Sequence, residues 1–228
     1  MNQYDRQLLN YLSGYVTDNK KGLIERNLAN RTRYVSLLLE NIYKPHNASA
    51  ILRTCDCLGI QDVHIVEEDD AYEVNPYVVR GASKWVDVYK YSTADGGSVQ
   101  TVKGLKNRGY RILATSPHKE GYLPDEIPID QPFVLALGNE HAGLSESILE
   151  MADGYVQIPQ VGFTESYNIS VAAAICLYGT MDRLWRSDTE WRLAEVEASV
   201  IRLDWYKKCV KNVNAHEKLF KKEYGKQQ

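Results

Sequence analysis

The stretch FVLALGNEHAGLS (133–145) changes abruptly from five apolar residues to a short run rich in Gly, Asn and Glu. The apolar part is typical of a strand that is buried on both faces of a sheet. Gly138 and Gly143 permit positive φ and close approach of the backbone to a ligand. Because α/β proteins bind ligands outside the carboxyl ends of their strands, this turn is a candidate binding loop.

Two other stretches have the same character: PHNASAILRTCD (45–56) and IPQVGFTESYNISVAAAICLY (158–178). In both, polar residues and glycine or proline cluster where an apolar strand or helix begins or ends. The three loops are far apart in sequence but similarly placed, so we expect them to form one composite site. Neither a G-x-G-x-x-G nor a Walker loop is present, which argues against a generic dinucleotide or triphosphate enzyme.

Strands and helices alternate along the chain, which predicts an α/β fold with a parallel sheet covered by helices on both faces. A last helical stretch within 189–224 has an apolar stripe, which we expect to pack against the body of the protein or a partner. Its members are Leu193, Val196, Val200 and Leu203. The expected strands are 34–40, 63–66, 86–91, 110–115, 133–138 and 155–159, and the expected helices are 3–13, 18–30, the stretch from Pro45 to Gly59, 98–108, 145–151 and 168–185.

The bulk composition of the 228 residues excludes some classes of protein. No apolar run reaches about 18 residues, so we expect no membrane span, and a signal peptide is not indicated, which favours a cytoplasmic protein. The four cysteines do not form a zinc pattern, and we interpret them as buried thiols and expect no metal.

The net charge of −3 argues against indiscriminate binding of nucleic acid, but the charges are unevenly distributed. Residues 20–35 hold five Lys or Arg against one Glu, and residues 202–228 hold eight against three acids. Basic ends around an acidic middle suit a polyanion that is held at its edges, and solvated terminal helices explain them equally well.

Two side chains of the first stretch are candidates for a site. Asn47 stands at the start of a helix, where a capping role alone would explain it. Arg53 follows in a largely apolar helix, where an unpaired buried charge would be costly. It pairs either with a carboxylate in the core or with a phosphate, which suits its two-pronged geometry.

The other two stretches offer further candidates. Glu140 directly follows a buried strand between glycines, a position more typical of a site than of an exposed loop, whereas His141 is either a base or incidental. Ser166 and Asn168 precede an apolar helix, where they either cap it or hold a polar group of a ligand.

Taken together, N-x5-R (47–53), LGNEHxGLS (137–145) and IPxxGxxxSxNISVAxAIxLY (158–178) closely resemble the three motifs of the SPOUT superfamily of S-adenosylmethionine-dependent RNA methyltransferases. Within it the chain resembles the TrmH group, which methylates ribose 2′-hydroxyls. The resemblance implies a SPOUT domain over 31–185, with a deep C-terminal trefoil knot and helical extensions at 1–30 and 186–228. It also implies a homodimer that modifies guanosine 18 of the tRNA D-loop.

The resemblance assigns roles to single residues. Arg53 matches the family's essential arginine, and Asn47, Glu140, Ser166 and Asn168 match positions that organise it. Thr115, Gly138, Ile158 and Tyr167 match positions whose backbone atoms contact the cofactor. Because arginine stays protonated, we interpret Arg53 as an orienting, charge-stabilising group. Two alternatives stay open: a ribosomal RNA 2′-O-methyltransferase and a catalytically silent RNA-binding factor.

Overall fold

The computed structural model describes residues 1–42, 44–67, 84–139 and 141–224, which form two compact units. One unit comprises residues 32–191, and the other joins residues 1–31 to residues 192–228. The two terminal extensions suggested by the sequence therefore come together as one unit, while the predicted domain limits stay a prediction.

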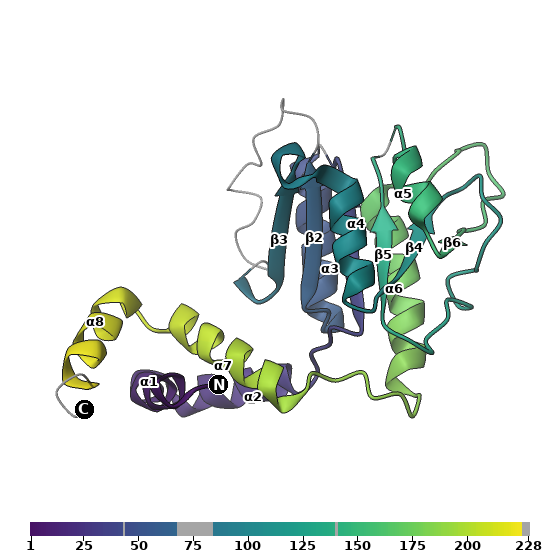
Figure 1. The fold of residues 1–228 in the computed structure, drawn as a ribbon. Helices are drawn as coiled ribbons and strands as arrows, with labels where there is room; N and C mark the ends of the chain where they lie inside the picture. Colours follow the sequence, from purple (N-terminus) through teal and green to yellow (C-terminus); the bar gives the residue numbers. More distant parts are fainter. Residues whose placement is uncertain (43, 68–83, 140, 225–228) are drawn as a thin grey trace. The chain divides into compact units, whose positions relative to one another are not determined.

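A six-stranded sheet forms the centre of the larger unit (Figure 1). All of its neighbouring strands are parallel, in the order β3-β2-β1-β5-β4-β6. The strands are β1 (Val35–Glu40), β2 (Asp62–Glu67), β3 (Asp87–Ser92), β4 (Arg111–Thr115), β5 (Phe133–Leu137) and β6 (Gly154–Val156). Every residue of β1 and β5 is buried, as their continuous apolar runs predict.

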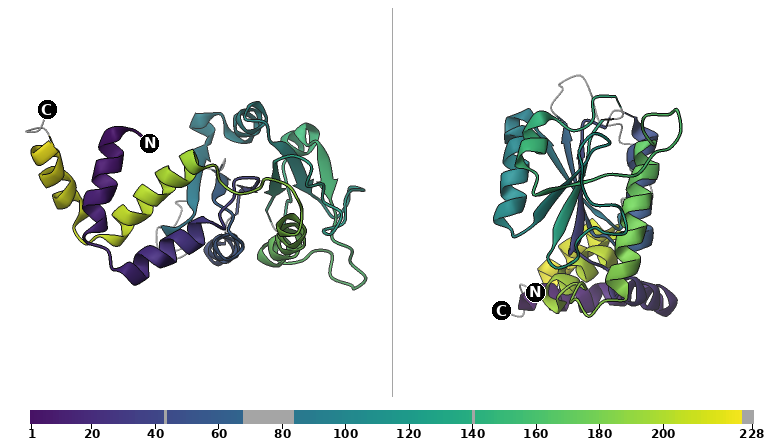
Figure 2. Two further views of the ribbon diagram at one scale, coloured as in Figure 1. Left: turned by 90° about the horizontal axis from the view of Figure 1, so that it is seen from below. Right: turned by 90° about the vertical axis from the view of Figure 1, so that its right-hand side faces the viewer.

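Helices cover both faces of this sheet (Figure 2), which confirms the predicted α/β architecture. On one face, α3 (Pro45–Leu58) and α6 (Ile169–Trp185) pack together over Leu37 and Leu39 of β1. On the other face, α4 (Gly97–Asn107) and α5 (Glu146–Met151) cover Leu38. A short 3₁₀ helix, η2 (Thr93–Asp95), precedes α4. The alternation of side chains along β1 thus supplies two separate cores.

The smaller unit consists of α1 (Gln3–Ser13), α2 (Asp18–Leu28), α7 (Glu195–Cys209) and α8 (Val213–Tyr224). Aromatic rings join α1 to α8, with Tyr4 5.4 Å from Phe220 between ring centroids. Trp205 of α7 is buried, and the guanidinium carbon of Arg31 lies 5.0 Å from its ring centroid. Arg202 joins α7 to α2 through an ion pair with Glu25 at 2.9 Å.

The predicted apolar stripe of the last helical stretch packs only in part against the chain itself, and its packing against a partner stays a prediction. Of its four members only Leu203 is buried, whereas Val196 and Val200 are 70% and 57% exposed. The stretch is two helices rather than one, separated near Asn212, which has a positive φ of 55°. Trp205 and Tyr206 determine the buried face of α7 instead, because their large rings bury more apolar area than valines do.

Candidate functional site

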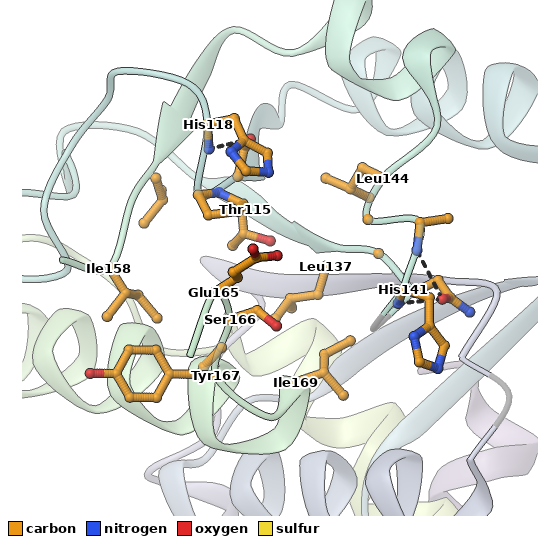
Figure 3. Close-up of a pocket in the computed structure, with 18 of the residues that line it drawn as sticks. Thr115, His118, Leu137, His141, Leu144, Ile158, Glu165, Ser166, Tyr167 and Ile169 are labelled. Atoms are coloured by element: carbon orange, nitrogen blue, oxygen red, sulfur yellow. Dashed lines mark hydrogen bonds between the residues drawn. The ribbon is translucent and has the colours of Figure 1, made fainter. Parts of the chain in front are cut away.

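A pocket of about 310 Å³ lies at the carboxyl ends of β4, β5 and β6 (Figure 3). These three strands are neighbours in the sheet, so the loops that follow them meet at one edge. The described lining comes from residues 115–118, 137–139 and 141–144, from Leu149, and from residues within 156–172. Much of it is apolar: Leu137, Leu144, Val156, Ile158 and Ile169. Two of the three predicted stretches therefore contribute to one pocket. Its volume lies at the lower end of the range of small-molecule sites.

The loop after β5 folds back tightly on itself. Asn139 and Gly143 exchange two backbone hydrogen bonds of 2.9 Å, and the Asn139 Oδ1 accepts from the backbone N–H of His141 at 2.7 Å. A Cβ atom on Gly138 would lie only 2.1 Å from the carbonyl carbon of Gly143, so only glycine fits there. Gly143 has a φ of 72°. The predicted positive φ is confirmed for Gly143, whereas Gly138 is required because it lies against the backbone of its own loop. Close approach of this loop to a ligand stays a prediction.

Five of the nine residues proposed from the resemblance line this pocket: Thr115, Gly138, Ile158, Ser166 and Tyr167. Thr115 ends β4 and donates a hydrogen bond from its hydroxyl to the carbonyl of Ala136 at 2.9 Å. Ser166 and Tyr167 lie in the loop before α6 and are exposed. Their roles stay predictions, but all four residues expected around the cofactor border the same cavity.

Asn47 and Asn168 connect the first predicted stretch to the third. The Nδ2 of Asn168 donates to the Oδ1 of Asn47 at 3.2 Å, which joins α3 to the start of α6. Asn168 also caps α6 through a 2.9 Å hydrogen bond from the backbone N–H of Ser170. The capping interpretation is thus confirmed for Asn168. It is wrong for Asn47, because Lys44 is the N-cap of α3 and Asn47 lies buried in its first turn.

Arg53 is exposed on α3, so the expectation that its guanidinium is buried and therefore needs a partner within the protein is wrong. The helix is apolar only on the face that carries Ile51, Leu52 and Cys55, and Arg53 lies off that face. It forms no ion pair with any residue that the structure describes, which removes the alternative of a carboxylate in the core. Glu140 lies outside the described residues, and His141 is exposed at the pocket.

Sequence reasoning missed the buried carboxylate of Glu40 at the end of β1. The hydroxyl and the backbone N–H of Ser145 each donate a hydrogen bond of 2.7 Å to the Glu40 carboxylate. The hydroxyl of Ser98 donates to it as well. Ser145 also caps α5, as predicted. The carboxylate therefore holds the end of the glycine loop against α4. A charged residue that ends an otherwise apolar strand was the available signal.

The groups with shifted pKa values include two on β2. Burial lowers the pKa of His64 to about 4, and its Nδ1 lies 3.0 Å from the hydroxyl of Tyr91. Burial raises the pKa of Asp62 even though Arg33 is paired with it at 3.0 Å and opposes the shift. Both residues are outside the pocket lining. They belong to the packing of the sheet rather than to the candidate site.

The cysteines only partly match the expectation of buried thiols. Cys55 and Cys176 are buried, Cys209 is half-buried and Cys57 is exposed. Cys55 and Cys57 therefore lie on different faces of α3. No group of three or more His, Cys, Asp or Glu side chains able to hold a metal occurs in the described ranges. Nor is any helix there long and apolar enough to cross a membrane.

The model of the SpoU rRNA Methylase family matches residues 34–178, a span that contains the pocket and all three predicted stretches. The chain therefore belongs to this family of RNA methyltransferases.

Two relatives within this family are tRNA-modifying enzymes. The chain is 41% identical over 208 residues to the tRNA (guanosine(18)-2′-O)-methyltransferase of Borreliella burgdorferi, which covers 91% of this chain and 94% of the relative. The crystal structure of the Aquifex aeolicus TrmH/SpoU tRNA modifying enzyme aligns with a TM-score of 0.73 at 31% identity, covering 86% of this chain and 98% of that one.

A third similarity is to the fold alone. The SpoU methyltransferase AviRb of Streptomyces viridochromogenes, solved in complex with AdoMet, aligns with a TM-score of 0.58 at 24% identity. The alignment covers 70% of this chain and 61% of that one.

Proposed function

We propose that this enzyme transfers the methyl group of S-adenosylmethionine to the 2′-hydroxyl of guanosine 18 in tRNA. The observation that carries the proposal is that the stretches 133–145 and 158–178 both line one pocket. The remaining stretch, 45–56, is joined to them by the hydrogen bond between Asn168 and Asn47. The extensive similarity to tRNA (guanosine(18)-2′-O)-methyltransferases supports the choice of substrate.

The pocket fits the proposed cofactor. Its apolar side chains suit an adenine ring, and backbone groups of the tightly folded glycine loop and of the loop before α6 suit its polar edges. Thr115, Gly138, Ile158 and Tyr167 would hold it. When bound, S-adenosylmethionine supplies an electrophilic methyl group on a sulfonium.

Arg53 is the group that we assign to the RNA. Its guanidinium is exposed, and no described residue neutralises it, so it is available to a phosphate, to which it can donate two hydrogen bonds. A ribose hydroxyl is a poor nucleophile, and stabilising its developing negative charge accelerates its attack. Asn47, buried in the first turn of the same helix and bonded to Asn168, would fix the position of α3 relative to the pocket. Glu140 and Ser166 would complete this arrangement.

A methylation assay tests the substrate directly. The purified chain is incubated with S-adenosylmethionine and unmodified tRNA, and ribose methylation is mapped at single-nucleotide resolution. We expect one modified position, guanosine 18, and none in the same tRNA when that nucleotide is a deoxyguanosine, which lacks the acceptor hydroxyl. Methylation of ribosomal RNA in preference to tRNA would contradict the proposal, as would binding of tRNA without methyl transfer to it.

We further propose that the enzyme is a homodimer of knotted subunits that acts in the cytoplasm, where tRNA is found. An exposed apolar stripe on α6 supports the dimer: Val171, Ile175, Tyr178 and Trp185 are 36% to 62% exposed at helical spacing. Covering such a stripe with a second copy would remove apolar surface from water. Light scattering of the purified chain checks this, and a Tyr178→Glu variant should dissociate the dimer.

A further inference from the structure

Glu165 has no role among the motif residues, yet its side chain borders the pocket. It lies in the loop between β6 (Gly154–Val156) and α6 (Ile169–Trp185) and is exposed. Figure 3 shows its side chain directed into the cavity. It forms no hydrogen bond or ion pair with any residue of the described ranges. Its charge therefore remains available to a ligand.

The rest of the described pocket lining offers little charge. It contains no Lys, Arg or Asp, and Glu165 is the one acidic residue among the described members. The remaining titratable side chains there are those of His118, His141 and Tyr167. A single carboxylate thus dominates the electrostatic potential that these side chains create in the cavity.

We propose that Glu165 discriminates the methyl donor from the demethylated product by charge. The inference rests on the proposed function. In that reaction a carbon–sulfur bond breaks, a carbon–oxygen bond forms to the ribose, and the hydroxyl proton is released to solvent. The sulfur changes from a cationic sulfonium to a neutral thioether. A carboxylate in the pocket attracts the first form and not the second, so Glu165 favours loading of S-adenosylmethionine and release of S-adenosylhomocysteine.

The size of the effect follows from the exposure of Glu165. Water screens the charge of an exposed carboxylate, so its effect on a bound cation is modest. We expect a change of about three- to tenfold in affinity, since about 1.4 kcal/mol corresponds to tenfold.

Equilibrium binding to the full chain, measured by calorimetry, tests the proposal with three ligands. They are S-adenosylmethionine, S-adenosylhomocysteine and sinefungin, which carries an ammonium in place of the methylsulfonium. Glu165→Gln should weaken binding of the two cationic ligands about three- to tenfold and leave the neutral product within about twofold. Glu165→Asp, which keeps the charge, should retain the preference, and about 0.5 M salt should reduce it in the unaltered protein.

Glu190→Gln is the matched control, because it removes the same charge from an exposed side chain outside the pocket lining. Its neighbour Trp191 accepts a hydrogen bond from Thr32, just before β1, at the opposite end of the strands from the pocket. This variant should bind all three ligands as the unaltered protein does. If Glu165→Gln weakened binding of all three ligands equally, or of none, the role of Glu165 would be overturned and the proposed function would still stand. Failure of the unaltered chain to bind any of them would overturn the proposed function as well.

Discussion

A methyl group added to Gly138 should destroy the pocket, whereas one added to Gly143 should only strain the loop. The Cβ of Gly138→Ala would lie 2.1 Å from the carbonyl carbon of Gly143, 2.2 Å from its oxygen and 2.2 Å from the nitrogen of Leu144. Carbon atoms normally approach to about 3.5 Å, so the loop would have to move by more than about 1 Å. All three neighbours are backbone atoms, which cannot turn aside as a flexible side chain can.

We expect the affinity for S-adenosylmethionine to fall by at least about tenfold, which corresponds to about 1.4 kcal/mol, because the displaced loop loses its contacts with the cofactor. Gly143→Ala is the matched control, because no atom lies within 4 Å of its added Cβ but its φ of 72° disfavours alanine. We expect it to lower the free energy of unfolding by about 1–2 kcal/mol and to leave the pocket open. Calorimetric binding and thermal unfolding separate the two effects. If Gly138→Ala bound the cofactor within threefold of the unaltered protein, the argument from close approach would be refuted.

Three further predictions concern the RNA, the terminal helices and pH. Arg53→Lys keeps the charge but loses the planar fork, so kcat should fall at least about tenfold with little change in unfolding temperature; a variant that kept most of its rate would show that the fork is unnecessary. Replacing the exposed lysines of the C-terminal stretch by Gln should weaken tRNA binding and flatten its salt dependence. These lysines are Lys211, Lys218, Lys221 and Lys222. Lys207→Gln and Lys208→Gln should change tRNA binding less, because these two side chains are already paired with Glu217 at 2.6 Å and Asp204 at 2.5 Å. Burial lowers the pKa of His64 from 6.5 to about 4, so its contribution to stability is present above pH 6.5 and is lost as the pH falls toward 4. About 3 kcal/mol of unfolding free energy should disappear over that interval, and denaturant unfolding of His64→Phe should show a smaller loss.

The sheet was predictable because its strands are buried on both faces, and such strands have continuous apolar runs that end in turn residues. The limits of β1, β4 and β5 fall within one residue of those expected. Strand order was not predictable in this way, because apolar runs carry no information about which strands are neighbours. The position of β1 between β2 and β5 came only from the structure.

Site residues were predictable where the backbone conformation restricts the residue type. They were less predictable where the role depends on the position of a side chain in the fold. Gly138 and Gly143 could be assigned because their geometry restricts the residue type. Arg53 was assigned a buried position by its apolar neighbours in sequence, but a helix has two sides, and the residue lies on the exposed one. Glu40 escaped notice because its hydrogen-bond partners lie 58 and 105 residues away along the chain.

The pairing of β1 with β5 has a consequence for synthesis on the ribosome. Val35 lies opposite Phe133 in the sheet, and β4 reaches the rest of the sheet only through β5. A nascent chain that has emerged as far as residue 132 can assemble β1, β2 and β3, but one edge of β1 is left without a neighbour. Unpaired edges of this kind attract other strands. The growing polypeptide is therefore most exposed to aggregation in the interval between the emergence of β3 and that of β5.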